Sequence, residues 1–192
     1  MVFILFQSLE IKNAKAKRFS GGISLLVKSD LRKGIKILNS SHEEFLWWKV
    51  DKNFFKLEDD IYVCSMYLPP QSLCYQKHKT TDYFSRLEDE ILKYNSLGKI
   101  ILCGDLNART SIEPDYIVNN KNPLDLASAH FSPDTDTSIH TYTRCSRDQA
   151  IPNCNSNGKQ LINLCKEFDL RILNGRCLGD SMGQFTGMAV VL

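Results

Sequence analysis

The segment KIILCGDLN, residues 99–107, decides the fold that this sequence predicts. Its first five residues are mostly branched and apolar, and they predict a fully buried strand. Gly104 and Asp105 follow directly, so a carboxylate is expected at the carboxyl end of that strand. Since side chains two residues apart share a face of an extended backbone, we expect Asp105 and Asn107 to address one site. A carboxylate and an amide suit a hard cation such as Mg²⁺ and a phosphate.

This short motif also has a simpler interpretation. Asp and Asn often do no more than close a turn, and an isolated match of four residues favours the turn. The other segments of the chain must therefore decide between a turn and a site.

Apolar segments separated by turn residues predict the elements on the amino-terminal side. Strands are expected over residues 22–28, 35–38, 45–50 and 61–68. The pair Pro69-Pro70 ends the last strand because proline offers no donor to a sheet. A helix is expected over residues 81–97, with capping residues at 80–82 and a stop at Gly98. Its apolar stripe at helical spacing comprises Phe84, Leu87, Ile91 and Tyr94.

The carboxyl-terminal side is less regular. Residues 110–151 are rich in Asn, Asp, Ser, Thr and Pro, which predicts long loops, a short helix around 124–129 and a functional surface. A second helix behind Asn157-Gly158 and a strand over 170–173 follow. The apolar face of that helix is expected in the core and comprises Leu161, Leu164, Cys165 and Phe168. Helices among many strands predict an α/β sandwich, and no linker or repeat divides residues 1–192, so we expect one domain.

Composition narrows the class of protein. Hydrophobic residues make up 43% and charged residues 24%, close to the averages for globular proteins, which does not suggest a disordered chain. No apolar stretch is long enough for a membrane span. The net charge of +2 carries no argument for nucleic acid. Seven cysteines form no C-x-x-C pair and several lie in apolar segments, so we expect reduced thiols in the cytoplasm or nucleus and no secretion.

Four segments together resemble the endonuclease domain of LINE-type retrotransposons, the apurinic/apyrimidinic-endonuclease-like branch of the endonuclease/exonuclease/phosphatase superfamily. Residues 20–28, SGGISLLVK, are similar to the first well-marked strand of that family. Residues 61–70, IYVCSMYLPP, resemble its "Y-x-P-P" strand end, and residues 100–109, IILCGDLNAR, resemble its "GDFNAR" signature. The fourth match extends from Asn157-Gly158 through ILNGR at 172–176 to GQFT at 183–186.

The resemblance implies a fold and an activity. The fold is a deoxyribonuclease-I-like, four-layer α/β sandwich of two mainly antiparallel sheets flanked by helices. The activity is hydrolysis of the DNA phosphodiester backbone with Mg²⁺ or Mn²⁺, in which a metal-assisted water attacks in line. Full-length relatives carry the domain fused to a reverse transcriptase, and no membrane partner is implied.

The resemblance also implies roles for individual residues. Asp105 corresponds to a metal-linked or proton-transferring carboxylate, Asn107 to a hydrogen-bond donor to the scissile phosphate, and Tyr67 to a second phosphate-side hydroxyl. Three further residues are expected to bind substrate: Arg109, Thr186 and Arg144. Arg144 has an alternative, since a surface salt bridge with Asp148 is the commoner explanation for such a pair.

Both ends of the family pattern differ in this chain. Relatives carry an Asn and a metal-binding Glu before the SGG strand, which here begins at residue 20, and Glu10 does not lie in the matching setting. Relatives also continue into a closing Ser-Asp-His, which none of the four histidines matches: His42, His78, His130 and His140. We therefore expect a domain truncated at both ends, weak metal binding and impaired activity. Two alternatives remain open: a catalytically dead retroelement relic, and a phosphatase or lipid phosphodiesterase of the same superfamily.

Overall fold

The computed structural model describes residues 3–6, 23–38, 44–68, 82–111, 113–117 and 154–174. The chain divides into two compact units, Met1–Asn107 and Ala108–Leu192. The expected short helix at 124–129 lies outside the described residues, and the single domain stays a prediction. Within the described ranges, no helix has the length and apolar character needed to cross a membrane.

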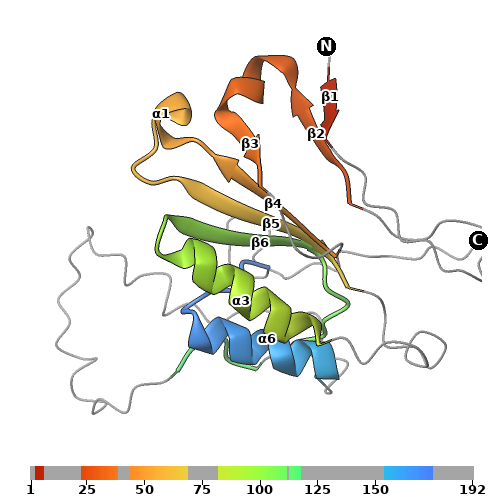
Figure 1. Ribbon diagram of the computed structural model, residues 1–192. Coiled ribbons are helices and arrows are strands. Elements are labelled where there is room, and N and C mark those ends of the chain that lie inside the picture. Colours follow the sequence, from red (N-terminus) through yellow and green to blue (C-terminus); the bar gives the residue numbers. More distant parts are fainter. Residues whose placement is uncertain are drawn as a thin grey trace, which may run out of the picture. The chain divides into compact units, whose positions relative to one another are not determined.

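The first unit is built on a mixed four-stranded sheet with the order β3-β4-β5-β6 (Figure 1). The strands are β3 (Ile35–Ile37), β4 (Phe45–Val50), β5 (Ile61–Tyr67) and β6 (Lys99–Asp105). Neighbours are antiparallel except β5 and β6, which are parallel. A separate antiparallel pair joins β1 (Phe3–Phe6) to β2 (Leu25–Lys28). The expected α/β class is thus confirmed, and the strand over 45–50 has the predicted bounds.

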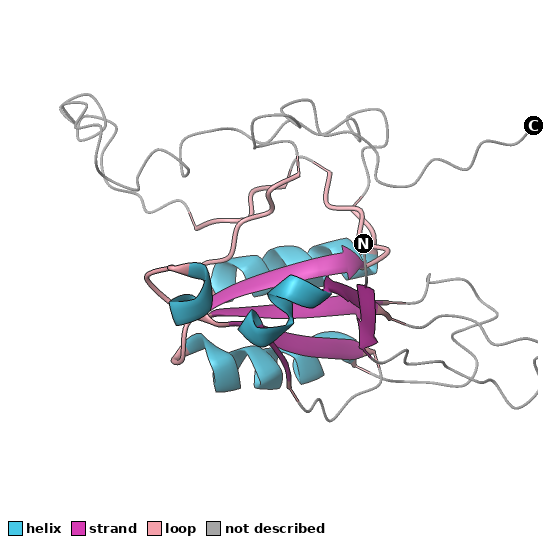
Figure 2. Ribbon diagram, turned by 90° about the horizontal axis from the view of Figure 1, so that it is seen from above, coloured by secondary structure: helices cyan, strands magenta, loops and turns pink. Residues whose placement is uncertain are grey.

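The helix α3 (Tyr83–Asn95) connects the two parallel strands and covers one face of the sheet (Figures 1 and 2). It begins where predicted, since the Asp82 side chain accepts a hydrogen bond from the Ser85 N–H at 3.1 Å. All four residues of the predicted apolar stripe are buried. The Tyr94 ring lies 4.7 Å from the ring of Trp47 and 5.1 Å from that of Tyr62. Burial of each large side chain contributes about 1.5–3 kcal/mol, so this layer anchors the parallel pair.

Two short elements were not predicted: the 3-10 helix η1 (Ser29–Gly34) and α1 (Lys52–Phe55). Gly34 allows close approach, because a Cβ there would lie 2.3 Å from the Phe54 ring. The Asp51 side chain caps α1 by accepting from the Phe54 N–H at 2.9 Å. Elements of four to six residues depend on such contacts rather than on a periodic pattern.

The second unit contains α6 (Ser156–Glu167), which Asn155 caps by accepting from the Gly158 N–H at 2.8 Å. Its predicted core face is only half right. Leu164 and Cys165 are buried, whereas Leu161 and Phe168 are half-buried. Ile162, which the prediction omitted, is 4% exposed, so the buried face is rotated from the predicted one.

The strand predicted from Lys99 is present, but its predicted full burial was wrong, and the strand predicted over 170–173 is absent. β6 is not fully buried, because it is an edge of the described sheet and α3 covers one face, which leaves Ile101 43% exposed and Cys103 exposed. Residues 170–173 form no strand. Their N–H groups serve other partners: that of Leu170 donates to the Cys165 carbonyl at 2.9 Å, and that of Ile172 donates to the buried Asp115 carboxylate at 2.7 Å.

Candidate active site

The carboxyl end of the parallel pair carries the predicted catalytic residues. Tyr67 is the last residue of β5, Asp105 is the last residue of β6, and the two are register partners. Immediately beyond them, the Leu68 N–H donates to the Asp105 carbonyl at 2.8 Å. Neighbouring parallel strands lie about 4.8 Å apart, so the side chains of Tyr67 and Asp105 stand next to each other on the same face.

Gly104 sets how closely β6 approaches β5 at this point. Its φ is +128°, a conformation that glycine adopts at no steric cost. A Cβ at this position would lie 2.0 Å from the Met66 carbonyl oxygen. A side chain here would push the strands apart and displace Asp105, so the glycine of the motif has a structural role.

Asn107 reaches the site by a different route from the one predicted. The extended alternation stops at Asp105, because Asn107 has φ +45° and lies in the left-handed region. Asparagine tolerates that region, since its short polar side chain forms local hydrogen bonds. Here the Asn107 N–H donates to Asp105 Oδ1 at 3.0 Å, and its Nδ2 donates to the Leu68 carbonyl at 2.7 Å. The predicted shared face of Asp105 and Asn107 was wrong, but Asn107 contacts the ends of both strands.

The Asp105 carboxylate has one oriented and one available oxygen. Oδ1 accepts from Asn107, while within the described ranges Oδ2 has no hydrogen-bond or ion-pair partner and the residue is exposed. Tyr67 is half-buried beside it. Among the described residues no group of three or more His, Cys, Asp or Glu residues could hold a metal ion. Among these described residues, one carboxylate fits Mg²⁺, with water and phosphate completing the coordination.

A second carboxylate at this end of the sheet escaped the sequence analysis. Glu44 directly precedes β4, and its carbonyl accepts from the Tyr67 N–H at 3.4 Å. The residue is 5% exposed. Burial of Tyr83 raises the pKa of its phenol, and the negative charge of Glu44 raises that pKa further. The sequence shows two consecutive acids, Glu43 and Glu44, before an apolar strand. Solvent-exposed acids give the same pattern, so the burial of Glu44 could not be predicted from it.

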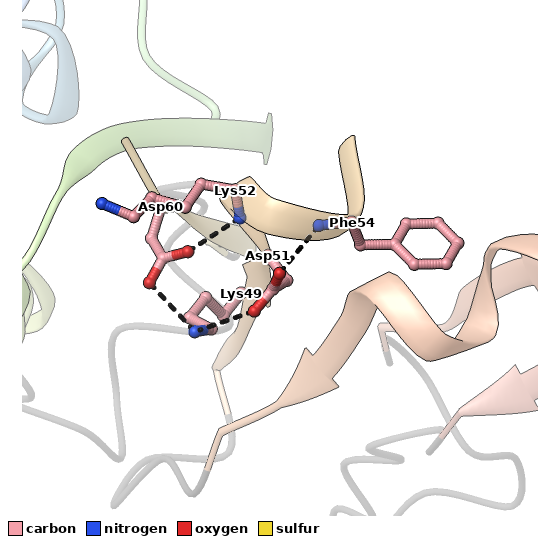
Figure 3. A network of polar contacts seen from close by, with 5 residues as sticks. All are labelled: Lys49, Asp51, Lys52, Phe54 and Asp60. Atoms are coloured by element: carbon pink, nitrogen blue, oxygen red, sulfur yellow. Dashed lines mark hydrogen bonds and ion pairs between the residues drawn. The ribbon is translucent and has the colours of Figure 1, made fainter. Parts of the chain in front are cut away.

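The opposite end of the same strands carries a paired charge cluster (Figure 3). Lys49 Nζ lies 3.0 Å from Asp60 Oδ2 and 3.6 Å from Asp51 Oδ2. Asp60 Oδ1 accepts from the Lys52 N–H at 2.8 Å. That backbone bond, together with the Lys49 ammonium, lowers the pKa of Asp60, and the hydrogen bond to Asp60 raises the pKa of Lys49. These contacts join β4, α1 and the start of β5, so we assign them to the fold.

The other predicted substrate residues are not brought to Asp105 by any described contact. Arg109 belongs to the second unit, where its side chain is exposed and its N–H donates to Asn155 Oδ1 at 2.9 Å. Gly158 allows α6 to begin there, because a Cβ would lie 1.8 Å from the Arg109 carbonyl oxygen. The remaining predicted positions lie outside the described residues: Arg144, Asp148 and Thr186, together with Glu10 and the four histidines.

The arrangement suits a cation held at Asp105 Oδ2, with a phenolic hydroxyl beside it and an amide that orients the carboxylate. Each of these groups lies at a strand end or in the loop that follows, where side chains can reach a ligand. Comparison of the chain with protein-family models, with curated proteins and with solved structures finds no significant match.

Proposed function

We propose that this chain is a metal-dependent phosphodiester hydrolase of the endonuclease/exonuclease/phosphatase superfamily, of the retrotransposon endonuclease type, and that it acts on DNA. The observation that carries the proposal is the adjacency of Tyr67 and Asp105 at the ends of parallel strands, with Asn107 hydrogen-bonded to Asp105. A turn alone accounts for Asn107 but not for a tyrosine in register with an exposed carboxylate.

The proposed roles follow from the hydrogen bonds. Because Asn107 holds Oδ1, the Asp105 carboxylate presents Oδ2 to Mg²⁺ or Mn²⁺. When bound, the cation neutralises charge on the phosphate and lowers the pKa of the attacking water. The Tyr67 hydroxyl donates to a non-bridging phosphate oxygen. The Asn107 amide, which donates to the Leu68 carbonyl at 2.7 Å, is proposed as a further donor to the phosphate.

Three positions are proposed as further contacts to the DNA backbone: Arg109, Arg144 and Thr186. With one carboxylate for the cation, we propose weak binding of Mg²⁺ and turnover well below that of an active nuclease. As in the relatives that the sequence resembles, the domain would serve next to a reverse transcriptase.

The proposed fold is the four-layer sandwich. Support comes from the face of the sheet opposite α3, which carries Leu46 and Val63 at 2% and 4% exposure. Side chains this apolar and this buried need a covering layer, and in the proposal a second sheet supplies it.

The test is metal-dependent nicking of supercoiled plasmid by the full chain at high enzyme concentration. We expect slow nicking with Mg²⁺ or Mn²⁺, none with EDTA, and a loss of about 100-fold or more in Asp105→Asn. Asp59→Asn is the matched control, because Asp59 is exposed before β5, at the other end of the strands. Equal nicking by the native chain and Asp105→Asn would contradict the proposal. If the chain hydrolyses a phosphoinositide in preference to DNA, the phosphoinositide is its substrate and DNA is not.

A further inference from the structure

The outer edge of β6 presents backbone groups without a partner in the described part of the chain. β6 pairs with β5 on one side: the Lys99 N–H donates to the Asp60 carbonyl at 2.9 Å, and the Asp105 carbonyl accepts from Leu68 at 2.8 Å. Successive residues of a strand direct their backbone groups to opposite sides. The groups that point away from β5 therefore belong to the alternate residues of the strand: Ile100, Leu102 and Gly104.

We propose that two copies of this chain associate through these edges, with the β6 strands antiparallel and Leu102 opposite Leu102 of the second copy. This register extends the sheet across both copies. Its hydrogen-bonded pairs are formed by the residues whose N–H and C=O groups point outward, because each Ile100 faces a Gly104 and the two Leu102 residues face each other. Every outward group of β6 then has a partner.

The sequence of β6 is complementary to itself in this register. The strand begins with Lys99 and ends with Asp105, both exposed, so each lysine lies opposite the aspartate of the other copy. Opposite charges directly across two strands stabilise the pairing, whereas like charges destabilise it. Between them, the 43% exposed Ile101 lies opposite the exposed Cys103. Because both the charges and the apolar residues of β6 match those of a second β6, we infer that the partner at this strand edge is a second copy of the chain.

Symmetry restricts the alternatives. The two copies are related by a two-fold axis perpendicular to the joint sheet, so the same face of each copy lies on the same side of that sheet. A residue of one β6 can therefore pair only with a residue of the other β6 that projects to the same face. Register shifts must then be of even size. Any such shift leaves part of β6 unpaired and separates Lys99 from Asp105. The pairing goes beyond the proposed hydrolase. Because both use the Asp105 carboxylate, Lys99 of the second copy would compete with the cation proposed at that carboxylate.

The first test is sedimentation of the full chain over concentrations of roughly 1 µM to 1 mM at low ionic strength, where charge pairs are least screened. We expect a reversible dimer. Lys99→Glu places a glutamate opposite each Asp105 and should weaken association about tenfold, as should Asp105→Lys. The double variant Lys99→Glu/Asp105→Lys exchanges the charges and should restore it. Lys36→Glu is the matched control, because Lys36 is an exposed lysine of β3, the other edge of the sheet.

The second test traps the register covalently. In the proposed pairing, Ile101 and Cys103 form a non-hydrogen-bonded pair, whose Cα atoms lie about 4.5 Å apart, within the range of a disulfide. Ile101→Cys should therefore give an oxidised dimer in which mass spectrometry links position 101 to Cys103 of the other copy. A monomer at every concentration, equal weakening by Lys36→Glu, no recovery in the double variant, or cross-links at other cysteines would each overturn the proposal.

Discussion

The two ends of the parallel pair β5–β6 use the same residue types for different purposes. At the amino end, both oxygens of Asp60 are occupied, one by the Lys52 N–H and one by the Lys49 ammonium. At the carboxyl end, Asp105 is exposed, and one of its oxygens is held by Asn107. A carboxylate with both oxygens bonded contributes to the fold, whereas one that is oriented on one side and exposed on the other is available to a ligand. The surroundings of an aspartate therefore separate structure from function better than its place in a motif.

Replacing the aspartate at each end by asparagine, which has the same shape, should have opposite effects on stability and on nicking. Asp60→Asn should cost stability and leave nicking unchanged. Asp105→Asn should lose nicking and change stability by less than about 0.5 kcal/mol, because an amide oxygen still accepts from the Asn107 N–H. Measuring both properties on both variants would show whether the division holds.

The largest effect on stability is expected at Gly104. Gly104→Ala adds a Cβ against the Met66 carbonyl and places a non-glycine residue at φ +128°. Overlap and strain together should cost roughly 2–4 kcal/mol. The urea midpoint measures this loss, with Cys103→Ala as the control at an exposed neighbour in the same strand. A Gly104→Ala protein as stable as the native chain would show that β6 does not approach β5 as described.

A smaller effect is expected at Asn107, where two contributions can be separated. Asn107→Ala loses the hydrogen bond to the Leu68 carbonyl and places alanine at φ +45°, for a total of about 1.5–2.5 kcal/mol. Asn107→Gly loses the hydrogen bond but adopts the same backbone without strain, so it should cost roughly 1 kcal/mol less than alanine. Urea unfolding of the two variants measures the difference. If Asn107→Ala and Asn107→Gly lose the same unfolding free energy, the left-handed backbone at position 107 does not contribute to stability.

The sequence predicted those features that depend on neighbouring residues. Continuous apolar segments defined β4 and β5, and helical spacing defined α3 with its cap at Asp82. Apolar segments look alike in buried strands and in edge strands, so the exposure of Ile101 could not be foreseen.

At the candidate site too, the features set by neighbouring residues could be predicted, and those set by contacts distant in sequence could not. The motif placed Asp105 correctly at a strand end, and the alignment of Tyr67 with it followed from two strands that end together. The left-handed turn at Asn107 depends on the carbonyl of Leu68, which is distant in sequence. The burial of Glu44 likewise depends on tertiary contacts that no spacing rule encodes.

The smallest effect is expected at Asp60, where it should appear as a dependence on pH. The pKa of Asp60 is lowered from its usual 3.8, so its contribution to stability is present above that pH and is lost as the pH falls through the lowered value. The pKa of Lys49 is raised from 10.5, so its contribution is present below that pH and is lost as the pH rises through the raised value. The difference in unfolding free energy between the native chain and Asp60→Asn should therefore be constant from about pH 5 to 9 and shrink on either side.

Salt provides the check on that difference. Both side chains are about one-fifth exposed, so NaCl at about 0.5 M should screen the Lys49 attraction and reduce the difference. The difference should not vanish, because an asparagine has one acceptor oxygen and cannot serve both the Lys52 N–H and the Lys49 ammonium. Asp59→Asn removes one negative charge at the adjacent position and serves as the control for net charge. If Asp59→Asn reproduces the pH profile of Asp60→Asn, the effect comes from the overall charge of the chain. The contacts of Asp60 would then not stabilise the fold, and the proposed difference between the two ends of the strands would be wrong.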